Sequence, residues 1–567
     1  MSTVDASAEP APSRSFDLRL VFAVWLSLLV YGAVAAPMPA VNEPHYLCKA
    51  KHFWQPAWCA QDFFLESPNA HTVFFVAVGG LTRWLSLAQT AWIARAAATL
   101  VLAVGWVSLT TRLLSARWSP LTACWLFLAF ASCGNLSGEW LVGGVEGKVF
   151  CYGLLFASFG QVLRGRIVPA GALAGLALSF HPVVGAWGVL AFAGACVVQR
   201  GTRSAERGAN EQLPSASLVV PANSALRAPR SALALILLAV LSLPGLIPVV
   251  QLLLESAPAA TKYSATYIQV YYRLAHHLDP MLFPLRAYAG YAVLLVLWVC
   301  LSRSENQTAE RRLFQRIVGW SMLFAFAGLL IGWGPRPPHR MPFFAERMHL
   351  LKFYPFRLAD VLVPLAVSIA ALRWLERKVG TAGQNAEAAS ETVSGVANDA
   401  EPGDSRPPLR KRKTGLTPSI GWGAVLFVLA LGRAHSVVEV NRYSGVLRAD
   451  WIGACRWIDQ HLPTDALVQA PHNGWAFKWF AGRAEYVAFK DCPQDAAGIV
   501  EWNRRLLFLK KWYEDQYVDQ FYSADELRGL RRETGITHLL TDRLGPLELE
   551  PVYRNETFQV YDLSSLD

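Results

Sequence analysis

The chain has 567 residues, of which 53% are hydrophobic and only 17% are charged, and its formal net charge is +10. Soluble domains carry about 25% charged residues, and long apolar stretches recur between positions 18 and 434, so the composition excludes an ordinary soluble protein and indicates a polytopic membrane protein. Basic residues collect in the cytoplasmic loops of such proteins, which explains the positive charge better than nucleic-acid binding, because no motif that reads nucleic acid is present.

In chain order, the first element is a polar segment rich in Pro, Ala and Ser at residues 1–17, which we expect to be a cytoplasmic tail. The apolar run 18–36 lacks a small-residue cleavage site before a soluble domain, so we predict a retained span rather than a removed signal peptide. Further apolar runs bring the predicted spans to about eleven. They are 90–113, 119–134, 149–163, 167–180, 183–199, 231–254, 287–301, 317–334, 356–374 and 417–434.

The apolar stretch 71–88 is ambiguous because it holds Arg83 and a pair of glycines. If it lies in the membrane interface rather than across the membrane, the arginine- and lysine-rich connections fall on the cytoplasmic side, as the positive-inside rule requires. We therefore predict a transmembrane domain over 18–434 with its N-terminus in the cytoplasm. Its first exterior loop is 38–89, and its cytoplasmic loops, rich in Ala, Ser, Glu and Gly and predicted to be disordered, are 200–230 and 378–414.

From residue 443 the pattern becomes that of a soluble domain, with short strands predicted at "ALVQAP", "AEYVAF", "THLLTD" and "FQVYDL" and a helix at "DWIGACRWIDQHL". A second helix, "SADELRGLRRETG", begins with the capping-box pattern of Ser523 and Glu526 and ends at Gly535. We expect 443–567 to be a small α/β domain on the outer side. An exterior compartment permits disulfides, here Cys48 with Cys59 and Cys455 with Cys492, and the sequence leaves the pairing open.

The first exterior loop is unusually polar, and Glu43 is its most suggestive residue. It lies just past the first span, after Pro37 and Pro39 and before Pro44, which holds a carboxylate near the membrane surface. A base that acts on a lipid-carried substrate needs that depth, so we expect Glu43 to be catalytic and its neighbour Asn42 to bind substrate. A solvated loop is the simpler interpretation of Lys49, Lys51 and His52.

The second exterior loop, "GNLSGEWLVGGVEGKVF" at 134–150, holds Glu139 and Glu146 among five glycines. Glycines let the backbone approach a ligand closely, so we expect Glu146 to be a second catalytic acid, more so than Glu139; a flexible hairpin between spans is the alternative. His181 precedes Pro182 at the outer end of the fifth span. It is a candidate for substrate binding, or it marks a proline-induced break.

Two later outer loops combine aromatic and cationic side chains. Loop 255–286 favours stacking on a sugar or binding of a headgroup over a metal site, because adjacent histidines on a helix point about 100° apart. Loop 335–357 is basic against the positive-inside bias, and phosphate is the obvious ligand; snorkelling, or pairing with Glu346 and Asp360, is the alternative. The expected substrate-binding residues are Lys262, Tyr263, Arg273 and His276 in the first loop and Arg336, Arg340, Arg347, Lys352 and Arg357 in the second.

This arrangement resembles the GT-C superfamily of membrane glycosyltransferases, which use polyprenyl-phosphate sugars. "NEPHYL" stands where those enzymes carry an acidic motif just past the first span, "GGVEGKVF" stands where they carry a second acid, and "SPNAH" is similar to their Lys/His-Pro-Pro-Leu segment. "FYPFRLADVLVPL" and "LPTDALVQAP" look like an uncharacterised bacterial membrane family related to the superfamily. The chain departs from the pattern, because Asn42–Glu43 replaces an acidic pair and the second acid is Glu, so dependence on a divalent metal ion stays open.

The resemblance implies an α-helical GT-C-like membrane protein that transfers a sugar from a polyprenyl-phosphate or pyrophosphate donor at the outer face of a bacterial cytoplasmic membrane. Glu43 would deprotonate or orient the acceptor, Glu146 would assist at the acceptor or at a metal, and the cations of 335–357 would hold the donor phosphate. The rivals are a transporter or lipid-handling protein and an inactive scaffold. Transporters place ionisable residues at the bilayer midplane, whereas the predicted spans are nearly free of acids.

Overall fold

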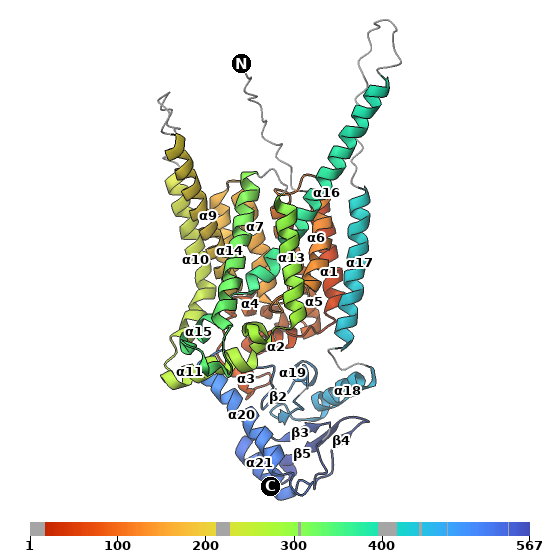
Figure 1. The fold of residues 1–567 in the computed structure, drawn as a ribbon. Helices are drawn as coiled ribbons and strands as arrows, with labels where there is room; N and C mark the ends of the chain where they lie inside the picture. Colours follow the sequence, from red (N-terminus) through yellow and green to blue (C-terminus); the bar gives the residue numbers. More distant parts are fainter. Residues whose placement is uncertain are drawn as a thin grey trace.

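The computed structural model describes residues 17–210, 227–303, 308–394, 417–440, 445–472, 474–542 and 544–566. Long helices run roughly side by side, and a small α/β domain lies against one end of them, which we name the domain end (Figure 1). The helices of this array are α1 (Leu18–Ala35), α5 (Leu87–Thr110), α6 (Ser119–Cys133), α7 (Gly147–Leu163), α8 (Ile167–Phe180), α9 (Pro182–Asn210), α10 (Arg227–Leu253), α13 (Leu285–Arg303), α14 (Ala309–Gly332), α16 (Arg357–Ser394) and α17 (Thr417–Val440).

Each apolar run that the sequence predicts to be a span coincides with a helix of this array. By length and composition, six of the described helices are apolar enough to cross a membrane, and α6, α7, α8, α9 and α17 contain shorter apolar stretches. The protein is therefore an α-helical multi-pass membrane protein with a small α/β domain, as predicted. The six longer candidates are α1, α5, α10, α13, α14 and α16.

The two loops predicted to be disordered are partly helical. Residues 201–210 continue α9, and residues 379–394 continue α16. Their Ala, Glu, Gln and Arg residues favour helix once a preceding helix has nucleated it, and disorder in the rest of both loops stays a prediction. The rest of both loops lies mostly outside the described residues.

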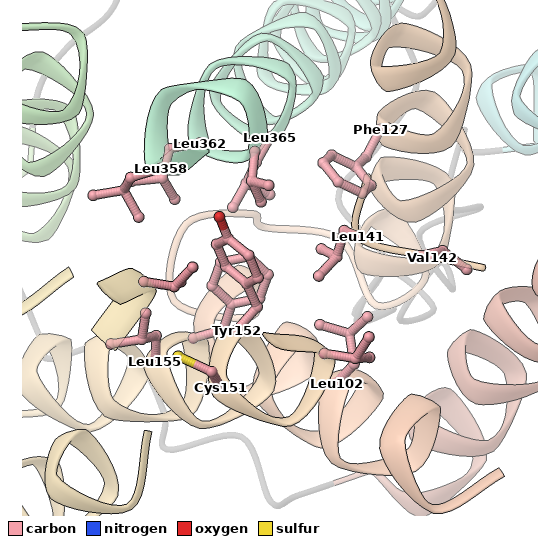
Figure 2. Close-up of a cluster of buried hydrophobic side chains, with 14 of the residues drawn as sticks. Leu102, Phe127, Leu141, Val142, Cys151, Tyr152, Leu155, Leu358, Leu362 and Leu365 are labelled. Atoms are coloured by element: carbon pink, nitrogen blue, oxygen red, sulfur yellow. The ribbon is translucent and has the colours of Figure 1, made fainter. Parts of the chain in front are cut away.

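Helix packing in the array depends on close backbone approach and on an apolar interior. Gly105 of α5 faces Gly153 of α7, and a Cβ atom at Gly105 would lie 2.0 Å from the carbonyl oxygen of Gly153. Small residues allow membrane helices to approach in this way. An apolar layer lies in the interior of the array (Figure 2). Its members include Leu102, Phe127, Leu141, Tyr152, Leu155, Leu358, Leu362 and Leu365, all buried.

Short helices cover the domain end of the array, and Figure 1 shows α2, α3, α11 and α15 there. The ambiguous stretch 71–88 forms the short helices α4 and η1 instead of a span, as predicted for an interfacial segment. The short helices are α2 (Glu43–Trp54), α3 (Phe63–Glu66), α4 (Thr72–Ala77), η1 (Gly79–Arg83), α11 (Ala259–Tyr267), η2 (Ile268–Arg273), α12 (Ala275–Leu278), η3 (Pro280–Leu282), η4 (Pro338–Arg340) and α15 (Phe344–Leu351).

The C-terminal domain is built on a five-stranded sheet of order β2-β1-β3-β5-β4, in which β1 runs parallel to β2 and β3, and β5 runs antiparallel to β3 and β4. The strands are β1 (Leu467–Gln469), β2 (Ala484–Glu485), β3 (His538–Thr541), β4 (Tyr553–Arg554) and β5 (Gln559–Asp562). The helices are α18 (Gly445–His461), α19 (Phe477–Ala481), α20 (Ala496–Asp515), α21 (Ala524–Thr534) and η5 (Leu563–Leu566).

Both faces of this sheet are covered, and the strands alternate between two apolar cores. Leu467 and Leu539 pack into the core that contains Trp502 of α20, whereas Val468 and Leu540 pack into the core that contains Trp451 of α18. The predicted capping box at the start of α21 is formed, and Gly535 ends the helix with a φ of +74°. The expected disulfides are not formed in the structure. Free thiols are found at Cys48, Cys59, Cys455 and Cys492.

Candidate functional site

A cluster of polar and charged side chains is buried at the domain end of the array, beside the apolar layer. It draws on the start of α2, the connection between α6 and α7, the junction of α8 and α9, and the first turn of α16. We name it the charged cluster and define it as Asn42, Glu139, Glu146, Lys148, His181 and Arg357, which are buried or partly buried.

Lys148 lies between the two carboxylates of the cluster. Its Nζ atom is 3.5 Å from Glu139 Oε1 and 3.4 Å from Glu146 Oε2, and it sits over the ring of Trp140 at 3.8 Å from the centroid. Glu146 is the N-cap residue of α7, yet its side chain makes no capping bond to that helix. The carboxylate is therefore available to the cluster, while the N-cap position fixes its backbone.

Arg357, the first residue of α16, joins the cluster from the opposite side. Its Nε atom lies 3.3 Å from Glu139 Oε2, its Nη1 atom lies 3.3 Å from His181 Nε2, and its guanidinium stacks over the ring of Tyr354 at 3.7 Å. His181 occupies the break between α8 and α9, and Pro182 begins the second helix. The proline-induced break predicted at His181 is therefore present, and a role of His181 in substrate binding stays a prediction.

Glu43 is fully buried but is already bound by four donors. Arg95 of α5 donates from Nε and Nη2 at 2.6 and 2.7 Å, and the backbone amides of Ala40 and Val145 donate at 2.7 and 2.9 Å. These contacts tie α2, α5 and the α6–α7 connection together, and they do not fit the free base that the sequence suggested. Its neighbour Asn42 instead donates to Glu146 Oε1 at 2.5 Å.

Two histidines near the cluster, His71 and His277, are neutral at physiological pH. Burial, together with the nearby His45 and Arg357 side chains, lowers the pKa of His71 to about 3. Burial likewise lowers the pKa of His277 to about 3, although its hydrogen bond to the Ser137 carbonyl acts in the other direction. The positive charge of the site therefore comes from Lys and Arg side chains.

The C-terminal domain contributes the segment that lies over the cluster. Arg273 of η2 donates from Nη2 to the backbone carbonyl of Lys490 at 2.8 Å and stacks on Phe489. Burial and the nearby Arg273 lower the pKa of Lys490 to about 8, and the charge of Glu146 opposes that shift. Since Glu146 and Lys148 both act on it electrostatically, Lys490 lies near the cluster.

A second buried ionic group joins this domain to the first loop. We name it the docking network: His45, Asp62, Lys478, Glu485 and Asp491. Lys478 of α19 lies 3.0 Å from Glu485 and 2.7 Å from Asp491 within its own domain. It also lies 3.3 Å from Asp62 in the first loop, and His45 of that loop lies 3.0 Å from Asp491. Both partners of each contact are mostly buried, so the network fixes the domain on the loop.

The solvated interpretation of Lys49 and His52 is wrong. The Lys49 ammonium is buried and donates to the Phe64 carbonyl at 2.7 Å and to Ser67 Oγ at 2.6 Å, and burial lowers its pKa to about 7. His52 is buried against the Trp58 carbonyl at 2.8 Å. The first loop is polar because it folds as a compact layer beneath the C-terminal domain.

The basic residues of 335–357 do not gather at the charged cluster. Arg336 pairs with Asp279, Arg347 donates to the Ile331 and Trp333 carbonyls at the end of α14, and Arg340 is exposed. Only Arg357 reaches the charged cluster, while Lys352 is partly buried. The expected alternative partners do not explain them either, because Asp360 accepts hydrogen bonds from Leu136 and Ser137, and Glu346 is exposed.

The candidates in 255–286 are also divided. Arg273 lies beside the cluster through its contact with Lys490. Tyr263 is exposed and packs edge-on against Phe344 at 6.3 Å. Lys262 is partly buried in α11, and His276 is exposed and stacks on His277 at 4.0 Å.

A divalent metal ion does not fit this cluster. Among the residues that the structure describes, no group of three or more His, Cys, Asp or Glu side chains is placed to hold an ion. The ammonium of Lys148 stands between the two carboxylates that would be the first candidates as ligands.

Several important residues were missed from the sequence. Lys148 follows Glu146 by two positions in "GGVEGKVF", so proximity along the chain was an available signal. Arg95 lies within an apolar run, where a buried arginine calls for an acidic partner. Lys478 and Lys490 look like surface lysines of a soluble domain, and no local pattern distinguishes them.

Comparison with known proteins gives one family match and likenesses to solved structures. A domain of unknown function (DUF6798) matches residues 449–508, within the C-terminal domain. No match was found among curated proteins.

Among solved structures, the chain is similar to ArnT from Cupriavidus metallidurans bound to undecaprenyl phosphate, with 15% identity, a TM-score of 0.47 and coverage of 97% of this chain and 98% of that chain. The apo state of the same protein gives 13% identity with the same coverage and TM-score.

Proposed function

We propose that this protein is a membrane glycosyltransferase that moves a sugar from a polyprenyl-phosphate donor to an acceptor at the outer face of a bacterial cytoplasmic membrane. The observation that supports this most is the charged cluster, in which Glu139 and Glu146 are enclosed with Lys148 and Arg357 at the ends of the membrane helices. A lipid-linked sugar would present its anomeric carbon at that depth.

The donor phosphate takes the place beside Arg357 and Lys148. Arginine makes paired, charge-assisted hydrogen bonds to phosphate, and lysine adds a compact positive charge. The contacts of Lys148 to both carboxylates are longer than the 2.7–2.9 Å of a tight charged hydrogen bond. A phosphate oxygen can therefore draw the ammonium away and free one oxygen of Glu146.

Glu146 is the group best placed to act as the base. Asn42 holds one of its oxygens, and the other, released from Lys148, accepts the proton of the acceptor hydroxyl. The acceptor oxygen forms the new bond to the anomeric carbon as the bond from that carbon to the phosphate oxygen breaks. Polyprenyl phosphate leaves with the electron pair, and Arg357 stabilises its charge.

Glu43 has a positioning role in this scheme. It binds the backbone amide of Val145, the residue before Glu146, and is itself fixed by Arg95. Glu43 thereby helps to hold Glu146 in position without itself touching the substrate.

Purified protein in detergent tests the proposal. Arg357→Gln should weaken binding of a polyprenyl phosphate by about 1.5–3 kcal/mol, the value of a charged hydrogen bond, whereas Arg340→Gln, at an exposed position, should not. Glu146→Gln should keep lipid binding and lower sugar release from a panel of polyprenyl-phosphate sugars by about 10²-fold. Equal losses in both arginine variants, or full turnover in Glu146→Gln, would overturn the assignment.

A further inference from the structure

The segment of the C-terminal domain over the charged cluster carries an ammonium that has no partner of its own. Lys490 is partly buried, and none of the described residues pairs with its Nζ atom. Its backbone is fixed, because its carbonyl accepts a hydrogen bond from Arg273 at 2.8 Å. A held lysine without a counter-ion is unusual inside a protein, since burying a charge is costly unless it is paired.

The carboxylates around Lys490 are already engaged elsewhere. Asp491 binds Lys478 at 2.7 Å and His45 at 3.0 Å. Glu146 is held by Asn42 at 2.5 Å and by Lys148 at 3.4 Å. After burial, the positive charges of Arg273 and Lys148 lower the pKa of Lys490 further, and the charges of Glu146 and Asp491 act in the other direction.

Positive charge is therefore in excess on this side of the cluster. Arg273 adds to it, because its Nε atom is buried without a hydrogen-bond partner among the described residues. An anion that entered between Lys490 and the cluster would compensate both groups. Phosphate suits the position, because its several oxygens can accept from separate cationic side chains at once.

We infer that Lys490 is an anion-binding residue that the C-terminal domain supplies to the membrane site, where it binds a phosphate or pyrophosphate group of a substrate. The inference rests on the proposed function for the identity of the substrate, but the anion site stands by itself. In this site Lys490 comes from the C-terminal domain, and the other cations, Arg357 and Lys148, come from the membrane helices.

The docking network gives this residue its position. Asp491 follows Lys490 directly and is bound on one side by Lys478 of its own domain and on the other by His45 of the first loop. Asp62 of the same loop binds Lys478 and accepts a hydrogen bond from the Glu485 amide at 2.9 Å. Any movement of the domain off the loop would carry Lys490 away from Glu146, so docking and anion binding are linked.

Chemical labelling of the whole protein tests the site directly. An amine-reactive acetylating reagent is applied at pH 8, and modification of Lys490 and of Lys510, an exposed lysine of the same domain, is followed by mass spectrometry. We expect inorganic pyrophosphate and a polyprenyl phosphate each to slow modification of Lys490 several-fold and to leave Lys510 unchanged. The parent polyprenol, which lacks the phosphate, should protect neither lysine.

Variants test the same residue without the reagent. Lys490→Met should weaken binding of the polyprenyl phosphate about tenfold, Lys490→Arg should restore most of it, and Lys510→Met should have no effect. An unchanged unfolding temperature in Lys490→Met separates loss of a ligand contact from loss of the fold.

The outcomes distinguish the inference from the proposed function. Protection by pyrophosphate but not by the lipid would support the anion site and overturn the lipid donor. Lipid binding that is normal in wild type and unaffected in Lys490→Met would support the donor and overturn the role of Lys490. Absence of protection by either ligand overturns the anion site.

Discussion

Arg95 binds Glu43 through two hydrogen bonds, from Nε to Oε1 at 2.6 Å and from Nη2 to Oε2 at 2.7 Å, and neither side chain is more than 2% exposed. Because of this pair, Glu43 is better understood as a structural residue than as a catalytic base. Breaking a buried pair by removing one charge leaves the other unpaired, which is far more costly than never having formed the pair.

Glu43→Gln should therefore destabilise the protein by about 3–5 kcal/mol, because it leaves the Arg95 guanidinium buried without a counter-ion. Denaturant unfolding in detergent measures the change, with Glu346→Gln, at an exposed position, as the matched control. Normal stability together with lost turnover would contradict this and would return Glu43 to the role of base.

Binding of phosphate to the site should weaken as the pH rises through about 8, the pKa of Lys490. Above that pH the ammonium becomes neutral, while a phosphate monoester stays dianionic, so only the protein loses charge. The groups that face Lys490 are Arg273, Lys148, Glu146 and Asp491. Titration calorimetry should show affinity falling about tenfold between pH 7 and pH 9. In Lys490→Arg the decline should be absent, because arginine keeps its proton.

Lys478→Met should release the C-terminal domain from the first loop. Without the ammonium, the carboxylates of Asp62, Glu485 and Asp491 face one another in a buried space, and removing one partner of such a group costs about 3–5 kcal/mol. Hydrogen exchange in α2 and β2 should accelerate. The control is Lys511, whose side chain is 79% exposed, and Lys511→Met should leave hydrogen exchange unchanged. Equal exchange in both variants would mean that apolar contacts alone hold the domain.

Labelling of single cysteines tests the proposed orientation. In intact cells, Val518→Cys, on an exposed position of the C-terminal domain, should react with a membrane-impermeant thiol reagent. Arg166→Cys, exposed in the connection between α7 and α8 at the opposite end of the array, should react only after the cells are permeabilised. Each variant is compared with the parent protein, whose native cysteines give the background. The reverse pattern would invert the proposed topology.

The sequence predicted the helix array well because the membrane imposes the length and polarity of each span. It also singled out Asn42, Glu146, His181 and Arg357 as polar residues near span ends, and the structure brings these four together in one cluster. The partners of these residues were not predictable. The contact between His45 and Asp491 joins positions 446 residues apart, and Arg340 and Arg357 look alike in the sequence although one is exposed and the other reaches Glu139.

The apolar layer beneath the charged cluster has a consequence for the cell that houses this protein. A buried cluster of ionisable groups inside a membrane protein could conduct protons or ions if a chain of polar atoms continued from it to the other face of the membrane. Here Leu102, Leu155, Leu358, Leu362 and Leu365 are buried together in the interior of the helix array (Figure 2). Tyr152, itself part of the layer, donates its hydroxyl to the Arg357 carbonyl at 3.0 Å and so links the layer to the charged cluster. Leucine side chains carry no group that can relay a proton or an ion, so this layer opposes leakage through the helix array.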